Sequence, residues 1–146
     1  MTSYQNLLEY INYFINEDGS GICSWSNDAI SRESTALSPY PIYNRDFSEF
    51  IDEVYSSGIL DLDYITTLKN KSIPCTDEMI DFIESADIAV LRAILSFYIC
   101  QEQFCEGLWI LASQNRAFYR ILVRLEKLED KIFQVNDENK SDTRNI

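Results

Sequence analysis

The residues best suited to do chemistry lie in one tetrapeptide, Phe104-Cys105-Glu106-Gly107, which holds a thiol and a carboxylate. Glu106 follows Glu102 by four residues, so on one uninterrupted helix the two carboxylates would share a face and could bind a hard cation. We expect the helix to break between residues 101 and 105. That break places Glu106 in the first turn of a new helix, where a negative charge suits the helix dipole, and it separates the two carboxylates.

For Glu106 and Gly107 we prefer a structural interpretation. Glu106 is expected to accept hydrogen bonds from backbone N–H groups, or to pair with Arg116 or Arg120, because no complementary set of ligands is evident. Gly107 is expected to lie where a neighbouring helix approaches too closely for a side chain. These residues remain the first to mutate in a search for function.

Cys105 would be a nucleophile if a helix N-terminus or an arginine lowered its pKa. The neighbouring Phe104 indicates burial, so core packing of both side chains is the preferred interpretation. The chain has no histidine. That absence removes Ser-His and Cys-His catalysis, imidazole metal centres and the commonest general base. We therefore expect no catalytic residue, leaning towards a protein that is not an enzyme.

The cysteines form neither a CxxC pair nor a dense disulfide pattern, and we expect them to be reduced and mostly buried. A structural zinc site needs closer pairs of cysteine or histidine. We accordingly expect no metal and no cofactor. The four residues are Cys23, Cys75, Cys100 and Cys105.

One organised basic feature stands out. Arg116, Arg120, Arg124 and Lys127 are spaced four, four and three apart, which places them on one side of a helix. Such a row is most often a solvated face or neutralises nearby acids such as Glu126. The other interpretation has it docking against the acidic first half, within the chain or across a dimer.

The net charge is −12, and its distribution is uneven. Residues 1–85 hold 15 acidic and 4 basic residues. This field repels nucleic acid and anionic membranes and attracts a basic protein surface. None of the acidic groups has the DxDxDG spacing of a calcium loop, so we interpret them as a solvated surface. The candidate acidic surface consists of Asp46, Glu49, Asp52, Glu53, Asp61, Asp63, Asp77, Glu78, Asp81 and Glu84.

Apolar residues recur at helical spacing along most of the chain, and no alternating strand pattern competes. We predict an all-α domain of six or seven short helices round one core. A loop containing Ser, Gly and Pro joins the first two helices, with a short extended piece near residues 22–25. The expected helices are 3–16, 45–57 with Asn44 as its cap, 61–70, a short one after Thr76, one starting after Ser85 or Asp87, one after residue 105, and one carrying Phe118, Ile121, Leu122, Leu125 and Leu128.

The chain resembles a family of small, uncharacterised bacterial proteins with an R-F-C-E-G signature. The likeness rests on QFCEG at 103–107, GSGICSW at 19–25, YPIY at 40–43 and FIDEVYSSGIL at 50–60. Two basic positions of the signature are Cys100 and Gln103 here, so an anion-binding role of those positions does not carry over. The resemblance implies no activity.

Size predicts a single domain over residues 1–135 and a polar, flexible tail at 136–146. No apolar run is long enough to cross a membrane, and the start lacks the basic segment of a signal peptide. We expect a cytoplasmic protein of bacterial or phage origin.

Two functions remain open. The first is a non-enzymatic interaction module with a basic protein partner, in its sharpest form an inhibitor that imitates nucleic-acid charge and blocks an anti-phage defence protein. The alternative is a small enzyme or ligand-binding domain with a pocket at the FCEG motif. A homodimer built on the last helix is a third hypothesis. Direct binding to nucleic acid or membrane is not expected.

Overall fold

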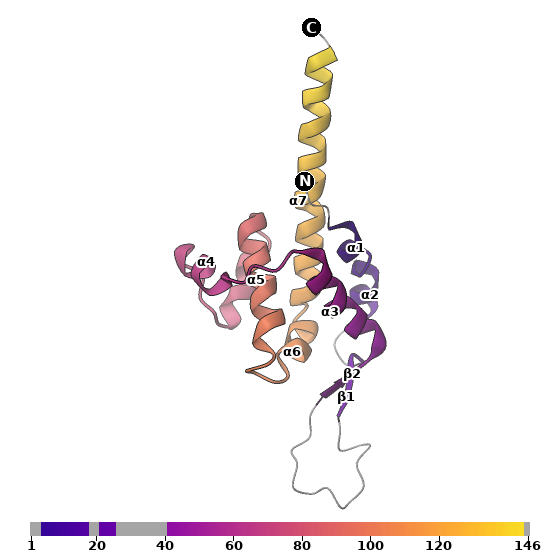
Figure 1. Ribbon diagram of the computed structural model, residues 1–146, viewed down its shortest axis with the longest axis vertical. Coiled ribbons are helices and arrows are strands. Elements are labelled where there is room, and N and C mark those ends of the chain that lie inside the picture. The colour runs from indigo at the N-terminus through magenta and orange to yellow at the C-terminus, as the bar shows by residue number, and fades with distance from the viewer. Residues whose placement is uncertain (1–3, 18–20, 26–40, 145–146) are drawn as a thin grey trace, which may run out of the picture.

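The longest helix, α7 (Ala117–Arg144), starts inside the body of the molecule and extends well beyond it (Figure 1). The computed structural model describes residues 4–17, 21–25 and 41–144, with side chains up to residue 130 apart from that of Trp25. The first half of α7 contacts helices from both the start and the middle of the chain. It is therefore the element to which the others attach.

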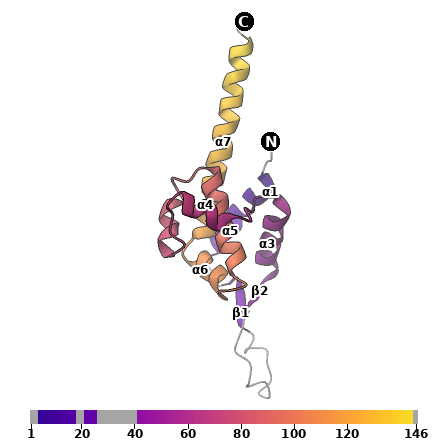
Figure 2. The same ribbon diagram turned by 60° about the vertical axis from the view of Figure 1, so that its left-hand side comes forward.

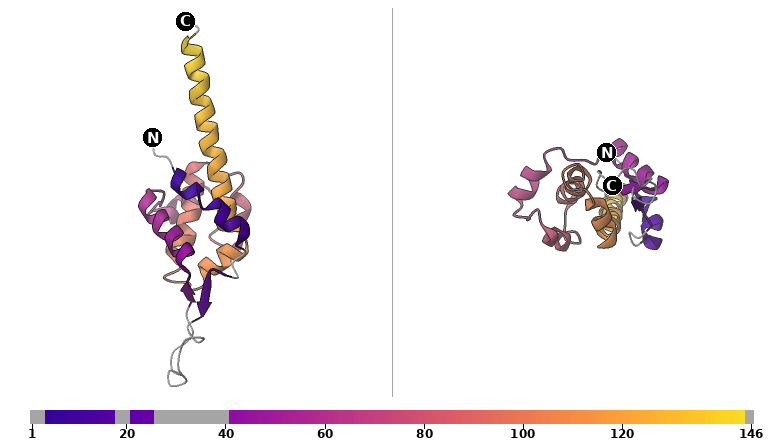
Figure 3. Two further views of the ribbon diagram at one scale, coloured as in Figure 1. Left: turned by 90° about the vertical axis from the view of Figure 1, so that its right-hand side faces the viewer. Right: turned by 90° about the horizontal axis from the view of Figure 1, so that it is seen from below.

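The helices lie in three layers (Figures 2 and 3). One outer layer holds α1 (Gln5–Leu8), α2 (Ile11–Asn16) and α3 (Arg45–Ser57). The middle layer holds α5 (Ile88–Gln101), α6 (Leu108–Gln114) and the start of α7. The other outer layer holds α4 (Tyr64–Asn70) and the 3-10 helix η2 (Asp77–Phe82). The mostly helical fold class predicted from the sequence is confirmed.

A small antiparallel ladder lies at one end of the body. Strand β1 (Cys23–Trp25) pairs with β2 (Pro41–Tyr43), with Cys23 opposite Tyr43. The expected extended piece is therefore a strand. The ladder brings Tyr43 to the start of α3, where Asn44 N–H donates to the Ile22 carbonyl at 2.7 Å.

Four phenylalanines from three helices form the centre of the core. Phe14 and Phe50 meet edge to face at 4.9 Å between ring centroids, and Phe118 lies 5.4 Å from Phe50 and 5.9 Å from Phe47. All four side chains are fully buried. Edge-to-face pairs contribute roughly 0.5–1.5 kcal/mol each beyond area burial, so this cluster fixes α2 and α3 against α7.

Helix α3 follows its sequence signals closely. The Asn44 side chain accepts from Phe47 N–H at 2.8 Å, as an N-cap should, and Gly58 ends the helix with a left-handed φ of 77°. Arg92 of α5 holds the following turn, since its Nε donates to the Ile59 carbonyl at 2.8 Å. On α5, Asp87 is the cap that the sequence offered beside Ser85: it accepts from Val90 N–H at 2.8 Å.

Two helices differ from their predictions. The expected helix 3–16 is interrupted at Glu9 and Tyr10, so it forms α1 and α2 with a bend that follows the curve of the core. In α4, the predicted apolar face was wrong: Leu62 is 88% exposed and Ile65 56% exposed, while Tyr64 and Leu68 are buried. The reason is that α4 starts at Tyr64, so the larger aromatic ring sets which side of this short helix faces α5.

Helix α7 continues to Arg144, beyond residue 135 where the sequence places the end of the domain. That boundary stays a prediction. Among the described residues, no helix has both the length and the apolar character that a bilayer crossing requires.

Candidate functional site

The loop between α5 and α6, residues 102–107, carries the tetrapeptide singled out in the sequence, and we call it the motif loop. The helix break expected at 101–105 is confirmed, because α5 ends at Gln101 and α6 starts at Leu108. Glu102, not Glu106, organises this loop. Its carboxylate accepts from Gly107 N–H at 3.0 Å and from Trp109 N–H at 2.9 Å, and it also accepts a hydrogen bond from the Tyr43 hydroxyl.

Tyr43 links the motif loop to the other end of the chain. Its ring lies 5.0 Å from that of Trp109 and 5.3 Å from that of Phe47, between centroids. Burial raises the pKa of the Tyr43 hydroxyl above its ordinary value, and the hydrogen bond to Glu102 and its charge raise it further. The hydroxyl therefore stays protonated and remains a donor to Glu102.

The predicted burial of the tetrapeptide was wrong. Phe104 is 76% exposed, and Cys105 and Glu106 are exposed as well. Among the described residues, Glu106 makes no hydrogen bond or ion pair, so it holds neither of the structural roles expected of it. The physical reason is that Glu102 satisfies the N–H groups at the start of α6 and pulls them inward, which leaves the loop between them facing solvent.

Gly107 also has a different explanation from the one expected. A Cβ added there would meet no atom within 4 Å, so no neighbouring helix requires its absence. Its φ of 95° is left-handed, a conformation that costs other residues energy. Gly107 is needed for the direction in which the chain turns into α6.

The cysteines are free thiols, as expected, but their predicted burial was wrong for two of them. Cys75 and Cys105 are exposed, whereas Cys23 and Cys100 are half-buried. In the described part of the chain, no group of three or more Cys, Asp or Glu side chains is placed to hold a metal ion.

The basic row docks against segments that precede it in the chain, which was the less favoured of the two interpretations. Arg116 donates to the Glu17 carbonyl at 3.0 Å and lies 4.7 Å from the ring centroid of Tyr119. Its φ of 69° is left-handed, so the row begins at the turn from α6 into α7 and not on a helical face.

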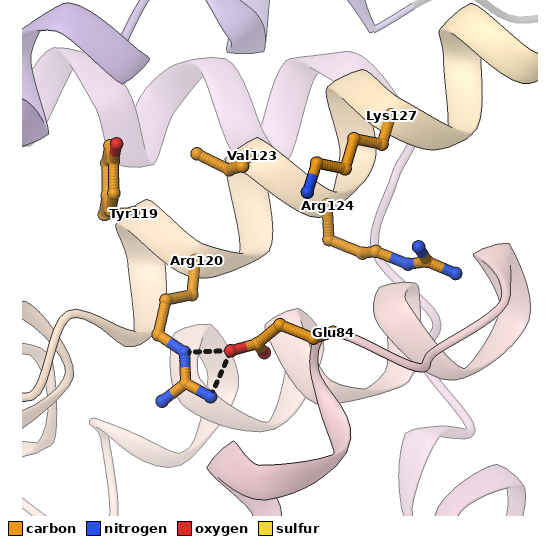
Figure 4. A pocket seen from close by; sticks show the side chains of 6 residues that line it. All are labelled: Glu84, Tyr119, Arg120, Val123, Arg124 and Lys127. Atoms are coloured by element: carbon orange, nitrogen blue, oxygen red, sulfur yellow. Dashed lines mark hydrogen bonds and ion pairs between the residues drawn. The ribbon is translucent and has the colours of Figure 1, made fainter.

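The next two arginines of the row extend from α7 toward η2 and the start of α5 (Figure 4). Arg120 donates to a Glu84 oxygen at 2.7 Å and to the Ile80 carbonyl at 3.0 Å. Arg124 donates to the Ala86 carbonyl at 2.9 Å. Because most of these acceptors are backbone carbonyls, the row fixes the path of the chain between η2 and α5.

A hollow of about 150 Å³ lies beside these contacts. Its lining consists of Glu84, Tyr119, Arg120, Val123, Arg124 and Lys127 (Figure 4). Arg120 is occupied by Glu84, whereas Lys127 is exposed. The hollow therefore carries more positive than negative charge in a chain whose net charge is −12.

The candidate acidic surface is divided between the two outer layers. Asp46, Glu49, Asp52 and Glu53 lie on α3, whereas Asp77, Glu78 and Asp81 lie on η2. Two of the ten acidic residues have structural partners. Asp61 accepts from Asp63 N–H at 2.9 Å and from the Thr67 hydroxyl at 2.7 Å, and Glu84 pairs with Arg120.

A second hollow, of about 340 Å³, lies on the acidic side of the molecule between the bend of α1 and α2 and the start of α3. Its lining residues are Glu9, Tyr10, Tyr13, Asp46 and Glu49, and we call it the acidic hollow. Burial raises the pKa of Tyr10, and the charges of Glu49, Glu53, Glu9 and Asp46 raise it further. The field of four carboxylates thus converges on one aromatic ring.

Sequence reasoning missed the main parts of both sites. It treated Tyr43 only as a ring that packs, and Glu102 only as a partner of Glu106. The position of Glu102 directly after α5 is the signal that was available, because a carboxylate there can reach the free N–H groups of the following helix. Glu9 and Tyr10 were placed inside one continuous helix, so the hollow at the bend was not foreseen.

Fold and sites together define a mostly α-helical domain with a small β ladder, two hollows of opposite charge and an exposed motif loop. The chain matches the family of unknown function DUF6508 over residues 1–131, and it belongs to that family. This agrees with the resemblance to an uncharacterised family, whose signature and bacterial origin stay predictions. No curated protein and no solved structure matches the chain.

Proposed function

We propose that this chain is a non-enzymatic protein-interaction module whose acidic side binds a basic segment of a partner protein. The observation that carries the proposal is the acidic hollow, in which Glu9, Asp46 and Glu49 surround Tyr10 and Tyr13. Carboxylates and tyrosine faces are the groups that recognise lysine and arginine side chains, through charge-assisted hydrogen bonds and cation–π contacts.

The charge of this side supports the same partner chemistry. Asp46, Glu49 and Glu53 are spaced three and four apart on α3 and therefore share one stripe of the helix. Arg45 pairs with Glu49 at 3.0 Å, but both side chains are at least half exposed, so water screens this pair. An arriving cation can displace Arg45 at little cost.

A finer form of the proposal is inhibition of a nucleic-acid-binding protein, such as one of anti-phage defence, by imitation of nucleic-acid charge. Its support is that residues 1–85 hold 15 acidic against 4 basic residues. This form makes one further prediction. A partner bound through its nucleic-acid site should be released from the chain by duplex DNA.

The experiment measures binding of a labelled nona-arginine peptide by fluorescence anisotropy at about 25 mM and about 300 mM salt, which brackets the range over which screening becomes strong. The double variant D46N/E49Q removes charge from the acidic hollow. The matched control D77N/E78Q removes the same charge from the first turn of η2, in the other outer layer.

We expect salt-sensitive binding that D46N/E49Q weakens by roughly tenfold and D77N/E78Q weakens much less, since the local field falls off within about 10 Å. Equal losses in both double variants would mean that net charge alone attracts the peptide, which contradicts the assigned site. Absence of binding at low salt would contradict the function itself.

The alternative, an enzyme or binding domain with a pocket at the FCEG motif, has less support. Both hollows are lined by residues outside the motif loop. The exposed side chains of Cys105 and Glu106 would have to act without the neighbouring groups that lower a thiol pKa.

A further inference from the structure

The hollow beside the basic row holds positive charge that the fold does not use. Arg120 is occupied by Glu84 and by the Ile80 carbonyl. Arg124 uses only its Nε, in the bond to the Ala86 carbonyl. Its two terminal nitrogens have no hydrogen-bond partner among the described residues, and neither has the ammonium group of Lys127.

These two unpaired cations line the same hollow. Figure 4 shows the Lys127 side chain running back along α7 toward Val123, while Arg124 extends away from the helix. A guanidinium group with free terminal nitrogens presents a planar pair of donors that matches the two oxygens of a carboxylate. An ammonium group adds a compact charge with rotatable donors.

The remaining lining is apolar. The Val123 side chain and the half-buried Tyr119 lie on the same side of α7 as Lys127, and Arg116 stacks on Tyr119 with 4.7 Å between guanidinium carbon and ring centroid. The stacking fixes the ring in place. A ligand that is only an anion would leave Val123 and Tyr119 uncovered, so the lining favours a ligand with a hydrocarbon part.

Size and charge narrow the ligand further. The hollow measures about 150 Å³. An apolar cavity of this volume accommodates one benzene ring. The Glu84 carboxylate at the edge, already bound to Arg120, repels additional negative charge and so disfavours a dianion such as phosphate.

We infer that this hollow is a binding site for a small organic monocarboxylate. Its carboxylate is held by the terminal nitrogens of Arg124 and by Lys127, and its ring or branched hydrocarbon part lies on Val123 and Tyr119. This site is separate from the acidic hollow: the two share no residue, and they differ in the sign of their charge. The inference therefore stands or falls independently of the proposed function.

The test uses the full chain and benzoate as the probe, followed by ¹H–¹⁵N correlation spectra. We expect saturable shifts at the backbone amides of residues 119–127, with a dissociation constant on the order of 1 mM, as fits a ligand of this size. Benzyl alcohol keeps the ring and lacks the charge, and inorganic phosphate keeps a charge and lacks the ring. Both should bind at least about fivefold more weakly, by the same affinity scale.

Two variants assign the contacts. Lys127→Gln removes an exposed side chain without bonds to the fold, so it should fold normally and weaken benzoate binding by roughly fivefold or more. Arg124→Lys keeps the charge, loses the planar pair of donors and should weaken binding similarly. The matched control Lys69→Gln removes an exposed lysine near the end of α4 and should leave the affinity unchanged.

Several results would overturn the site. Shifts that grow without saturation, or that spread over the whole chain, would mean binding at high concentration only. Equal affinity for benzyl alcohol would remove the role of Arg124 and Lys127. Tighter binding of phosphate, or equal losses in the Lys127→Gln and Lys69→Gln variants, would show that the charge alone attracts the anion and that no built site exists.

Discussion

Replacing Glu102 with alanine is the sharpest test of how the motif loop is held. The carboxylate accepts from Gly107 N–H at 3.0 Å, from Trp109 N–H at 2.9 Å and from the Tyr43 hydroxyl. Hydrogen bonds to a charged group contribute roughly 1.5–3 kcal/mol each, and the donors left behind add a desolvation penalty. Because Glu102 is only half-buried, we take less than the sum and expect a loss of about 3 kcal/mol in the free energy of unfolding.

Urea denaturation followed by tryptophan fluorescence measures this loss, and a loss of about 3 kcal/mol corresponds to a decrease of roughly 6–12 °C in the melting temperature. Glu106→Ala is the matched control, since it removes the same side chain from the same loop at an exposed position. It should change stability by no more than about 0.5 kcal/mol. If the two variants lose equal stability, or if Glu102→Ala loses under about 0.5 kcal/mol, the reasoning about the motif loop is refuted.

Two further predictions concern the same region. Because burial and Glu102 raise the pKa of Tyr43, the folded state keeps this proton longer than the unfolded state; the resulting stability is full below about pH 10 and is lost as the pH rises above that value. Urea denaturation between about pH 9 and 11 should show a shallower decline for Tyr43→Phe than for the natural chain, and an identical slope would contradict the assigned proton. Gly107→Ala should cost about 1 kcal/mol through its left-handed φ of 95°, since a Cβ there has open space; a neutral effect in the same assay would show that the loop can turn otherwise.

Local signals in the sequence predicted the helix boundaries where they were strongest. Asn44, Gly58 and Asp87 act as the caps that their residue types favour, because capping depends on groups within three or four positions along the chain. The buried face of α7 up to Leu125 was also predictable, since every fourth or third residue there is apolar.

The motif loop was less predictable because its outcome depends on contacts distant in the chain. Two glutamates four residues apart looked equivalent, and the sequence does not say which of them folds back onto the start of α6. Tyr43 decides this, from 59 positions earlier in the chain. Phe104 was expected inside because its type is mostly buried, whereas the turn at Gly107 leaves it at the surface.

The short helix α4 shows a related limit. Its sequence offers two apolar stripes, and only the packing of Tyr64 and Leu68 against α5 selects one of them. The two hollows were beyond prediction for the same reason, since each is lined by residues from separate segments. The acidic hollow needs the bend between α1 and α2, and the basic one includes Glu84 of the segment that precedes α5.

The arginine contacts along α5 and α7 have a consequence for how this protein tolerates change. Arg92, Arg116, Arg120 and Arg124 each bind at least one backbone carbonyl, at residues 59, 17, 80 and 86 respectively. A carbonyl is present whatever amino acid occupies the position, and it does not take up a proton at the pH where carboxylates do. The acceptor segments can therefore accumulate substitutions, and the medium can turn acidic, without removing the acceptors that these four cations bind.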